Sequence, residues 1–221
     1  MTWGLIGRVI VGITLVAGCV STPDTTPSTP DPAAPAPGAP APTAGSAEPI
    51  LREDKDLERV WLVPGFRFSG YDALYVVETR TDVPRLHPDG MENLQWARGV
   101  VRDELVGAIG ARKLFGTVIA SEADLRPGVR ALRLENTIIE YEKGGGGARY
   151  WAGLYGAGQP VIKVRGRVAD GDRAVFLFET RRSGVSGKAR WLGAYMSDKD
   201  IQTEDIRSLA KAVAEFMAAP R

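Results

Sequence analysis

The chain has 221 residues, with 28 lysines and arginines against 27 aspartates and glutamates, and a formal net charge of +1. This balance excludes a general nucleic-acid binder, which would carry a basic excess. One histidine and one cysteine provide too few ligands for a zinc centre and no second thiol for an intramolecular disulfide. We therefore expect neither a metal nor another cofactor.

The first residues have the features of a secretory signal. Arg8 gives a positively charged start, and the apolar run that follows it to residue 20 is shorter than the roughly 20 residues that span a bilayer. The run ends in a lipobox, Leu15-Val16-Ala17-Gly18-Cys19. Small residues admit the signal peptidase, and a thiolate is the nucleophile that accepts diacylglycerol. We predict that residues 1–18 are a lipoprotein signal peptide and that Cys19 carries the lipid.

Two other interpretations of this segment remain open: a plain signal peptide with a chance cysteine, or an uncleaved N-terminal helix. With two or three acyl chains, Cys19 would anchor the protein stably in a membrane. Val20, rather than aspartate, follows the cysteine. By similarity to lipoprotein sorting in double-membraned bacteria, this favours the outer membrane. We expect a lipid-anchored protein that faces the periplasm.

Residues 19–49 form a separate region rich in proline, alanine and threonine. No large apolar residue occurs between Val20 and Ile50, so the region has nothing with which to build a core. We predict a disordered linker, which is either a tether with a functional length or a spacer without one. Residues 50–221 are predicted to form a single domain.

The first half of this domain is predicted to contain a strand, a helix and two further strands. Residues 73–81 are rich in β-branched and aromatic types, and residues 83–90 have the composition of a loop. Residues 114–120 and 129–142 are the next strands. Between the loop and these strands, apolar residues recur at helical spacing: Leu94, Ala97, Val101, Leu105 and Ile109.

The second half is predicted to contain a hairpin and a closing helix. One strand alternates between an apolar side (Ile162, Val164, Val168) and a basic side, Asp170-Gly171 forms a turn, and residues 174–180 form the returning strand. The closing helix is marked by Ile206, Leu209, Val213, Phe216 and Met217, with Thr203 as its cap and Glu204 and Asp205 in its first turn.

These elements predict an α/β domain: a single mixed β-sheet with helices on one face, in the order β-α-β-β-β-β-α, after the proline-rich linker. The first strand–helix–strand unit should be parallel and right-handed.

Residues that could perform catalysis are few. His87 lies in a predicted loop with no catalytic motif around it, so we interpret it as a surface residue. Glu135, Glu140, Glu142 and Glu179 lie on or near predicted strands, and two carboxylates in one cleft could hydrolyse a glycosidic bond. Solvated strand ends are the simpler interpretation. We expect the protein not to be an enzyme.

Two surfaces are candidates for binding. The glycine-rich segment 144–158 contains Arg149, Tyr150, Trp151 and Tyr155, which either contact a partner or pack as part of a structural turn. The basic side of the predicted hairpin strand carries Lys163, Arg165 and Arg167. This side is either a surface for an anionic partner or a solvated sheet face.

The pattern of the domain resembles a bacterial lipoprotein family of unknown function, domain of unknown function 4410. The resemblance is carried by Gly156-Ala157-Gly158, Ile162-Lys163-Val164, Asp170-Gly171-Asp172, Glu179-Thr180-Arg181 and the closing helix. Related envelope lipoproteins resemble the N-terminal domain of the Tol-system propeller protein in fold. The resemblance implies an α/β domain behind a lipobox and a spacer, and it implies no catalytic residues.

These observations lead to one main hypothesis and two alternatives. We expect an outer-membrane lipoprotein whose non-catalytic domain binds an envelope partner, either a protein or a glycan. The first alternative is a cell-wall or polysaccharide-active hydrolase that uses a carboxylate pair. The second is an accessory subunit of an envelope export or assembly machine.

Overall fold

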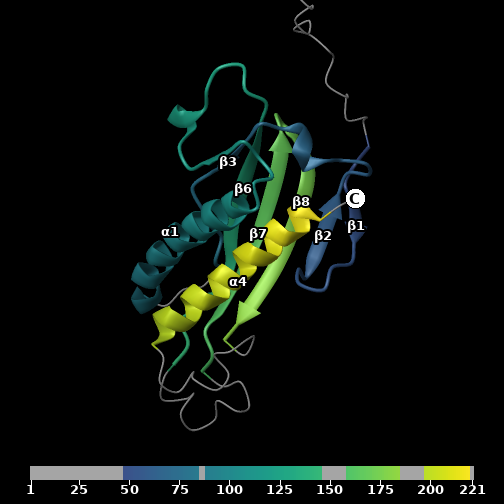
Figure 1. The fold of residues 1–221 in the computed structure, drawn as a ribbon. Coiled ribbons are helices and arrows are strands. Elements are labelled where there is room, and N and C mark those ends of the chain that lie inside the picture. Colours follow the sequence, from purple (N-terminus) through teal and green to yellow (C-terminus); the bar gives the residue numbers. More distant parts are fainter. Residues whose placement is uncertain (1–46, 85–87, 146–157, 185–196, 220–221) are drawn as a thin grey trace, which may run out of the picture. The chain divides into compact units, whose positions relative to one another are not determined.

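The computed structural model describes residues 47–84, 88–145, 158–184 and 197–219. These residues form one open, mixed sheet of eight strands with two α-helices on one of its faces (Figure 1). The predicted fold class is thereby confirmed. The elements in chain order are β1 (Ile50–Arg52), β2 (Arg59–Leu62), β3 (Ala73–Val76), β4 (Arg80–Thr81), α1 (Pro88–Ala111), β5 (Thr117–Ile119), β6 (Ala131–Glu142), β7 (Val161–Asp170), β8 (Arg173–Ser183) and α4 (Asp198–Ala218), with short 3-10 turns at Phe68–Gly70 and Glu122–Asp124.

The strand order is β1-β2-β8-β7-β6-β3-β5, and β4 also pairs with β6. From β1 to β6 in this order every pairing is antiparallel, whereas β3 runs parallel to both β5 and β6. The parallel strand–helix–strand unit expected from the sequence is β3, α1 and β5. Strands β1 and β5 form the two edges of the sheet.

Several predicted boundaries are wrong, and each error has a local cause. The predicted strand 73–81 is broken into β3 and β4. The chain advances four residues from Val76 to Arg80 while its partner β6 advances only three, from Leu134 to Thr137, so the pairing is interrupted. Helix α1 begins at Pro88, inside the predicted loop; a proline at the first helical position loses no hydrogen bond there. Strands β1 and β2 were not expected at all.

The closing helix begins earlier than predicted. Ser197 is its N-cap: the Ser197 hydroxyl accepts a hydrogen bond from the Asp200 N–H, and the Asp200 carboxylate accepts one from the Ser197 N–H. Thr203 is not the cap, because its hydroxyl donates to the Lys199 carbonyl inside the helix. Asp205 therefore lies beyond the first turn, and its side chain is buried.

The core lies between the two helices and the sheet. All five residues of the predicted α1 stripe are buried, as are Leu132, Leu134 and Ile138 of β6. Phe176 is the centre of an aromatic group: its ring stacks on Phe216 of α4 at 5.0 Å and contacts Phe68 and Phe178 at 5.6 and 5.5 Å. Gly166 makes room for this group, since a Cβ there would lie 2.1 Å from the Phe178 ring.

Candidate functional site

The face of the sheet opposite the helices is open. Strand alternation places every second residue on this face, and the strand register aligns them in rows across the sheet. One row is Thr137, Arg165, Glu179 and Arg59; the next is Glu135, Arg167, Leu177, Trp61 and Leu51. The second row changes from charged to apolar side chains as it approaches the edge strand β1.

Ion pairs cover most of this open face. The Glu179 side chain is 9% exposed and accepts a hydrogen bond of 2.8 Å from Arg165 Nε, with Lys163 Nζ at 3.7 Å and Arg59 Nη1 at 3.9 Å. Lys163 also contacts Glu58 at 2.9 Å. Charges on neighbouring strands are therefore paired across the sheet.

The same pattern continues towards β6. Arg181 contacts both oxygens of Glu140 at 3.0–3.2 Å, and this hydrogen bonding raises the pKa of Arg181. Glu135 lies 3.3 Å from both Arg167 and Arg133. The ion-pair lattice, as we call it, consists of Arg59, Arg133, Lys163, Arg165, Arg167 and Arg181 with Glu58, Glu135, Glu140 and Glu179.

The lattice bears on two sequence-derived candidates. Lys163, Arg165 and Arg167 do lie on one face, and each has a carboxylate partner, so the stripe is a balanced surface rather than a free positive one. Glu135, Glu140 and Glu179, three of the four carboxylates considered for hydrolysis, are spread over this face and engaged by cations.

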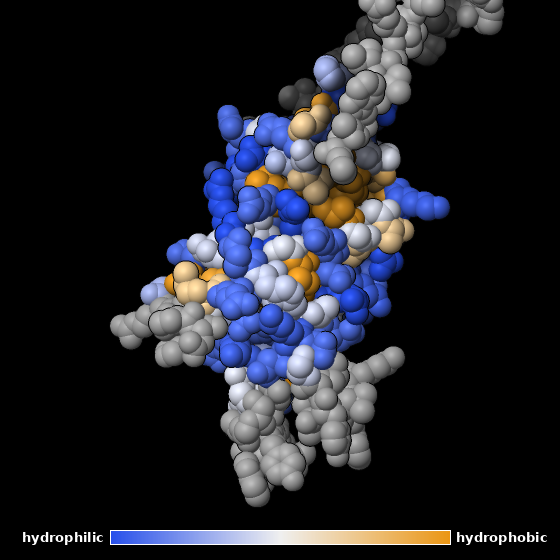
Figure 2. All heavy atoms as spheres, turned by 90° about the vertical axis from the view of Figure 1, so that its left-hand side faces the viewer, coloured by the Kyte–Doolittle hydropathy of each residue, from blue (hydrophilic) through white to orange (hydrophobic). Residues whose placement is uncertain are grey.

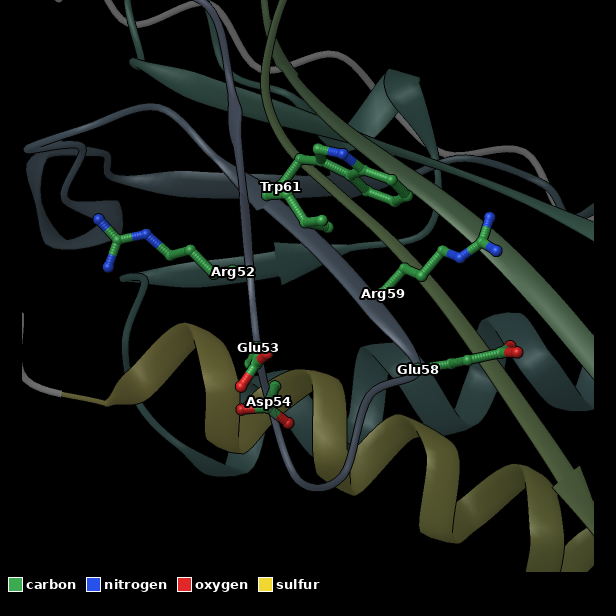
Figure 3. Close-up of a pocket in the computed structure, with 7 residues that line it drawn as sticks. Arg52, Glu53, Asp54, Glu58, Arg59 and Trp61 are labelled. Atoms are coloured by element: carbon green, nitrogen blue, oxygen red, sulfur yellow. The ribbon is translucent and has the colours of Figure 1, made fainter.

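Beside the lattice lies a groove of about 570 Å³, which we call the hairpin groove. Its walls are the two strands β1 and β2 and the loop between them, residues 53–58. The lining residues are Leu51, Arg52, Glu53, Asp54, Glu58, Arg59 and Trp61. Figure 3 shows Glu58 and Arg59 pointing away from Arg52, with Glu53 and Asp54 at the end of β1. The groove thus combines one aromatic ring with charges of both signs.

Exposed apolar side chains occur on β1, the edge strand that forms one wall of this groove, and Leu51 lines the groove itself. Within the described ranges, the exposed large hydrophobic residues are Ile50 (49%), Leu51 (64%) and Met91 (60%), and two of these three are in β1. Trp61 is half-buried and lies between Leu51 and Leu177 in the register. Natural sheets usually protect an edge strand with charge or cover it, so an apolar open edge is a candidate for contact with a partner.

Figure 2 shows the side of the molecule that includes α1, where hydrophilic residues cover most of the described surface and hydrophobic ones appear in several separate areas. Met91 is the exposed large apolar residue of α1. Single residues of this kind are ordinary on protein surfaces.

The loop of the hairpin groove is connected to the inside of the domain. Leu57 is buried, and the Asp54 carboxylate accepts hydrogen bonds from the N–H groups of Asp56 and Leu57 at 2.9 and 3.0 Å. Arg182 of β8 donates to the Asp56 carbonyl at 2.7 Å and to Thr180 Oγ1 at 3.0 Å. The arginine therefore ties the loop to the helix-covered face of the sheet.

Asp205 of α4 is the buried carboxylate whose charge acts on Arg182. Asp205 is only 3% exposed, and its Oδ2 atom has no hydrogen-bond partner among the described residues. Burial raises the pKa of Asp205 from 3.8 to about 7, against the opposing effect of the Arg182 charge. Burial also lowers the pKa of Arg182. We call Thr180, Arg182, Asp205 and the Asp56 carbonyl the Arg182 cluster.

Several sequence-derived candidates lie outside the described residues. These are Cys19 with its lipobox, the linker up to residue 46, His87, and the four residues Arg149, Tyr150, Trp151 and Tyr155. Within the described ranges, no three His, Cys, Asp or Glu side chains gather in a way that would hold a metal ion. No described helix is both long and apolar enough to cross a membrane.

The comparisons with known proteins give similarities at the level of structure. The solved structures that match include a PelC dodecamer from Paraburkholderia phytofirmans, with 16% sequence identity and a TM-score of 0.42. The match covers 67% of this chain and 92% of the PelC chain. A DUF330 protein from Xanthomonas campestris matches at 14% identity, 77% and 92% coverage and a TM-score of 0.42. A lipoprotein from Neisseria meningitidis matches at 12% identity over 55% of this chain and 90% of its own, with a TM-score of 0.31.

At these identities and TM-scores, no function is transferred from the three proteins to this chain. No family model matches the sequence. No curated protein matches it either. The resemblance to domain of unknown function 4410 therefore stays a prediction.

Sequence reasoning did not find the hairpin groove or the Arg182 cluster. A weak signal for β2 exists in Arg59-Val60-Trp61-Leu62, where polar and apolar residues alternate only once. Ile50 and Leu51 mark the end of the linker, but three residues are too few for a strand to be recognised. Asp205 carries no sequence signal of burial, because acidic residues are common near helix starts.

Proposed function

We propose that this protein is a cell-envelope lipoprotein, anchored through Cys19, whose domain binds an envelope partner without chemical conversion of it. The anchor is supported by the lipobox and by the proline-rich stretch between it and the domain. The binding role is supported by one structural observation above all: the open edge strand β1 exposes Leu51 at the hairpin groove, and Ile50 of the same strand is exposed on the other face of the sheet.

The chemistry of the groove favours a protein partner in an extended conformation. An edge strand can add a further strand through main-chain hydrogen bonds, and neighbouring pockets then select side chains. Leu51 and Trp61 offer an apolar surface, while Arg52 and Glu53 offer charges of both signs. A peptide with alternating apolar and charged residues fits this combination. A glycan would use the Trp61 ring and the same polar groups, and it is the other outcome of the test.

The anchor is tested by fractionation of cells that express the Cys19→Ala variant. The variant should leave the membrane fraction, because it lacks the thiol that accepts the lipid. Full membrane association of Cys19→Ala would contradict the anchor and leave the binding role untouched.

The groove is tested by purifying the lipidated protein from membranes with and without two groove substitutions. Leu51→Lys places a charge on the edge, and Trp61→Ala removes the ring; both should lose the partner. Glu140→Gln, on the same face but outside the groove, is the matched control and should retain it. Equal recovery of the partner with all three variants would overturn the proposed site.

A further inference from the structure

We propose that Asp205 and Arg182 form a proton-controlled clasp that holds the β1–β2 loop against the domain and so regulates the hairpin groove. The regulatory part rests on the binding role proposed above. The clasp itself rests on two observations: the hydrogen bond from Arg182 to the Asp56 carbonyl of the loop, and the buried Asp205 carboxyl on α4, whose Oδ2 atom has no partner among the described residues.

Arg182 links strand β8 to the β1–β2 loop. It lies on the helix-covered face, directly across from Ile162 of β7, whose side chain is fully buried. Its guanidinium donates to three oxygens, which belong to Thr180, Arg181 and Asp56. Two of them are on β8 itself. The bond to Asp56 is thus the polar connection from this arginine to the loop.

Several polar and apolar groups lie near Asp205. The charges that act on Asp205 are those of Arg182 on β8, which lowers its pKa, and of Glu204 on its own helix, which raises it. The neighbouring residues in the row beneath α4 are Ile162, which is apolar, and Tyr141 of β6, whose hydroxyl donates to Gln202 at 3.0 Å. Asp56 of the loop acts on Arg182 by its charge.

The cation of α4 that follows Asp205 in the chain is directed away from this cluster. Arg207, two residues after Asp205, pairs with Glu104 of α1 at 3.2 Å and is half-exposed. Residues two apart on a helix lie on nearly opposite sides. Arg182 is accordingly the cation to which an ionised Asp205 would respond.

The clasp responds to the protonation state of Asp205. With Asp205 protonated, Arg182 has no anionic acceptor in the cluster, and it binds the Asp56 carbonyl as observed. When Asp205 releases its proton to solvent, its carboxylate becomes a stronger acceptor than a neutral carbonyl. Arg182 then turns towards Asp205, the Asp56 carbonyl loses its donor, and the loop is held less firmly. The groove is ordered at low pH and loosened at high pH.

The clasp is tested by hydrogen–deuterium exchange on the full lipidated chain in detergent, with protection factors corrected for the intrinsic effect of pH. The amides of Asp56 and Leu57 should lose protection between pH 6 and pH 8, with a midpoint near the pKa of about 7. Asp205→Asn, which is neutral at every pH, should keep the protection and remove the transition. Glu204→Gln, a neighbouring exposed carboxylate, is the matched control and should retain the transition, with its midpoint at a slightly lower pH because the Glu204 charge contributes to the raised pKa.

A further variant tests the role of the arginine. Arg182→Gln should give low protection of the loop at every pH, while the peptides of β7 (Val161–Asp170) stay protected and show that the fold is intact. The clasp is overturned if Asp205→Asn retains the transition, or if Arg182→Gln leaves the loop as well protected as before.

Regulation of the groove needs one more measurement, by photo-cross-linking with Leu51→p-benzoylphenylalanine at pH 6 and pH 8. Stronger cross-linking to the partner at pH 6, and equal cross-linking at both values in Asp205→Asn, supports regulation. Equal cross-linking at both values in the otherwise unchanged chain overturns it. Absence of any adduct at either pH contradicts the proposed groove instead, and the exchange experiment still decides on the clasp.

Discussion

The two faces of the sheet differ in how their side chains are stabilised. On the helix-covered face, Phe176 and its neighbours are packed against α1 and α4, and the Arg182 cluster is the polar exception described above. On the open face, cross-strand ion pairs replace apolar packing, and the row from Leu177 to Leu51 is the apolar exception. Each exception lies next to the β1–β2 loop, the part of the domain that we propose binds the partner.

The largest effect is expected from a truncation on the helix-covered face. Phe176→Ala removes a ring that contacts three other aromatic rings, and we expect a loss of about 3–5 kcal/mol in the free energy of unfolding. Urea denaturation measures it. Leu177→Ala, the next residue but on the open face, should cost clearly less. Equal losses would show that both faces are packed alike and would break the comparison.

Removal of the buried carboxylate should have the opposite sign. Burial raises the pKa of Asp205 from 3.8 to about 7, so between these values the folded protein holds a proton that the unfolded chain has released. Stability due to this group is complete below about pH 4, falls as the pH rises from about 4 to about 7, and stays at its low value above that. Asp205→Asn should therefore stabilise the protein at pH 8 by about 1–3 kcal/mol, and much less at pH 5. Thermal unfolding at both pH values measures this; a gain independent of pH would refute it.

Overpacking tests the same face in another way. Gly166→Ala places a Cβ 2.1 Å from the Phe178 ring, and we expect a cost of about 1–3 kcal/mol. Gly107→Ala is the matched control, because a Cβ at that position in α1 meets nothing within 4 Å. The control should stabilise the helix slightly. If both substitutions were neutral in urea denaturation, the Phe178 ring would have room that the structure does not show.

The smallest effects are expected on the open face. Glu179→Gln removes the charge that Arg165 and Lys163 share, and about 1–2 kcal/mol should be lost because the carboxylate is mostly buried. Glu140→Gln acts on a more exposed pair and should cost about 0–1 kcal/mol. Added salt should reduce the second effect more than the first. The reverse order of the two losses would contradict the assignment of Glu179 to the centre of the lattice.

The sequence was informative where a pattern extends over many residues. The stripe of α1 and the alternation of Ile162, Val164 and Val168 in β7 predicted a helix and a strand with correct buried faces. The glycine at the β7–β8 turn, Gly171, has the positive φ of 57° that its turn suggested. In these elements local periodicity and burial agree, so the sequence alone is sufficient.

Prediction failed where distant residues decide the structure. Strand β2 exists through its pairing with β8, more than 100 residues later in the chain. The partners of Lys163 and Arg165 depend on strand register, which places Glu179 opposite Arg165 and Arg181 opposite Lys163. Burial of Asp205 depends on which side of α4 faces Arg182. Both candidate sites combine segments of this kind, and this explains why they were found only in the structure.

The most direct test of the account is photo-cross-linking in intact cells at two positions of the open face. Leu51→p-benzoylphenylalanine places the probe at the hairpin groove, and Arg181→p-benzoylphenylalanine places it in the ion-pair lattice. The account predicts a discrete adduct from position 51, lost when Trp61→Ala is added, and little adduct from position 181. An adduct of equal yield from both positions, or one from position 181 alone, would contradict the claim that the partner binds at the β1–β2 loop.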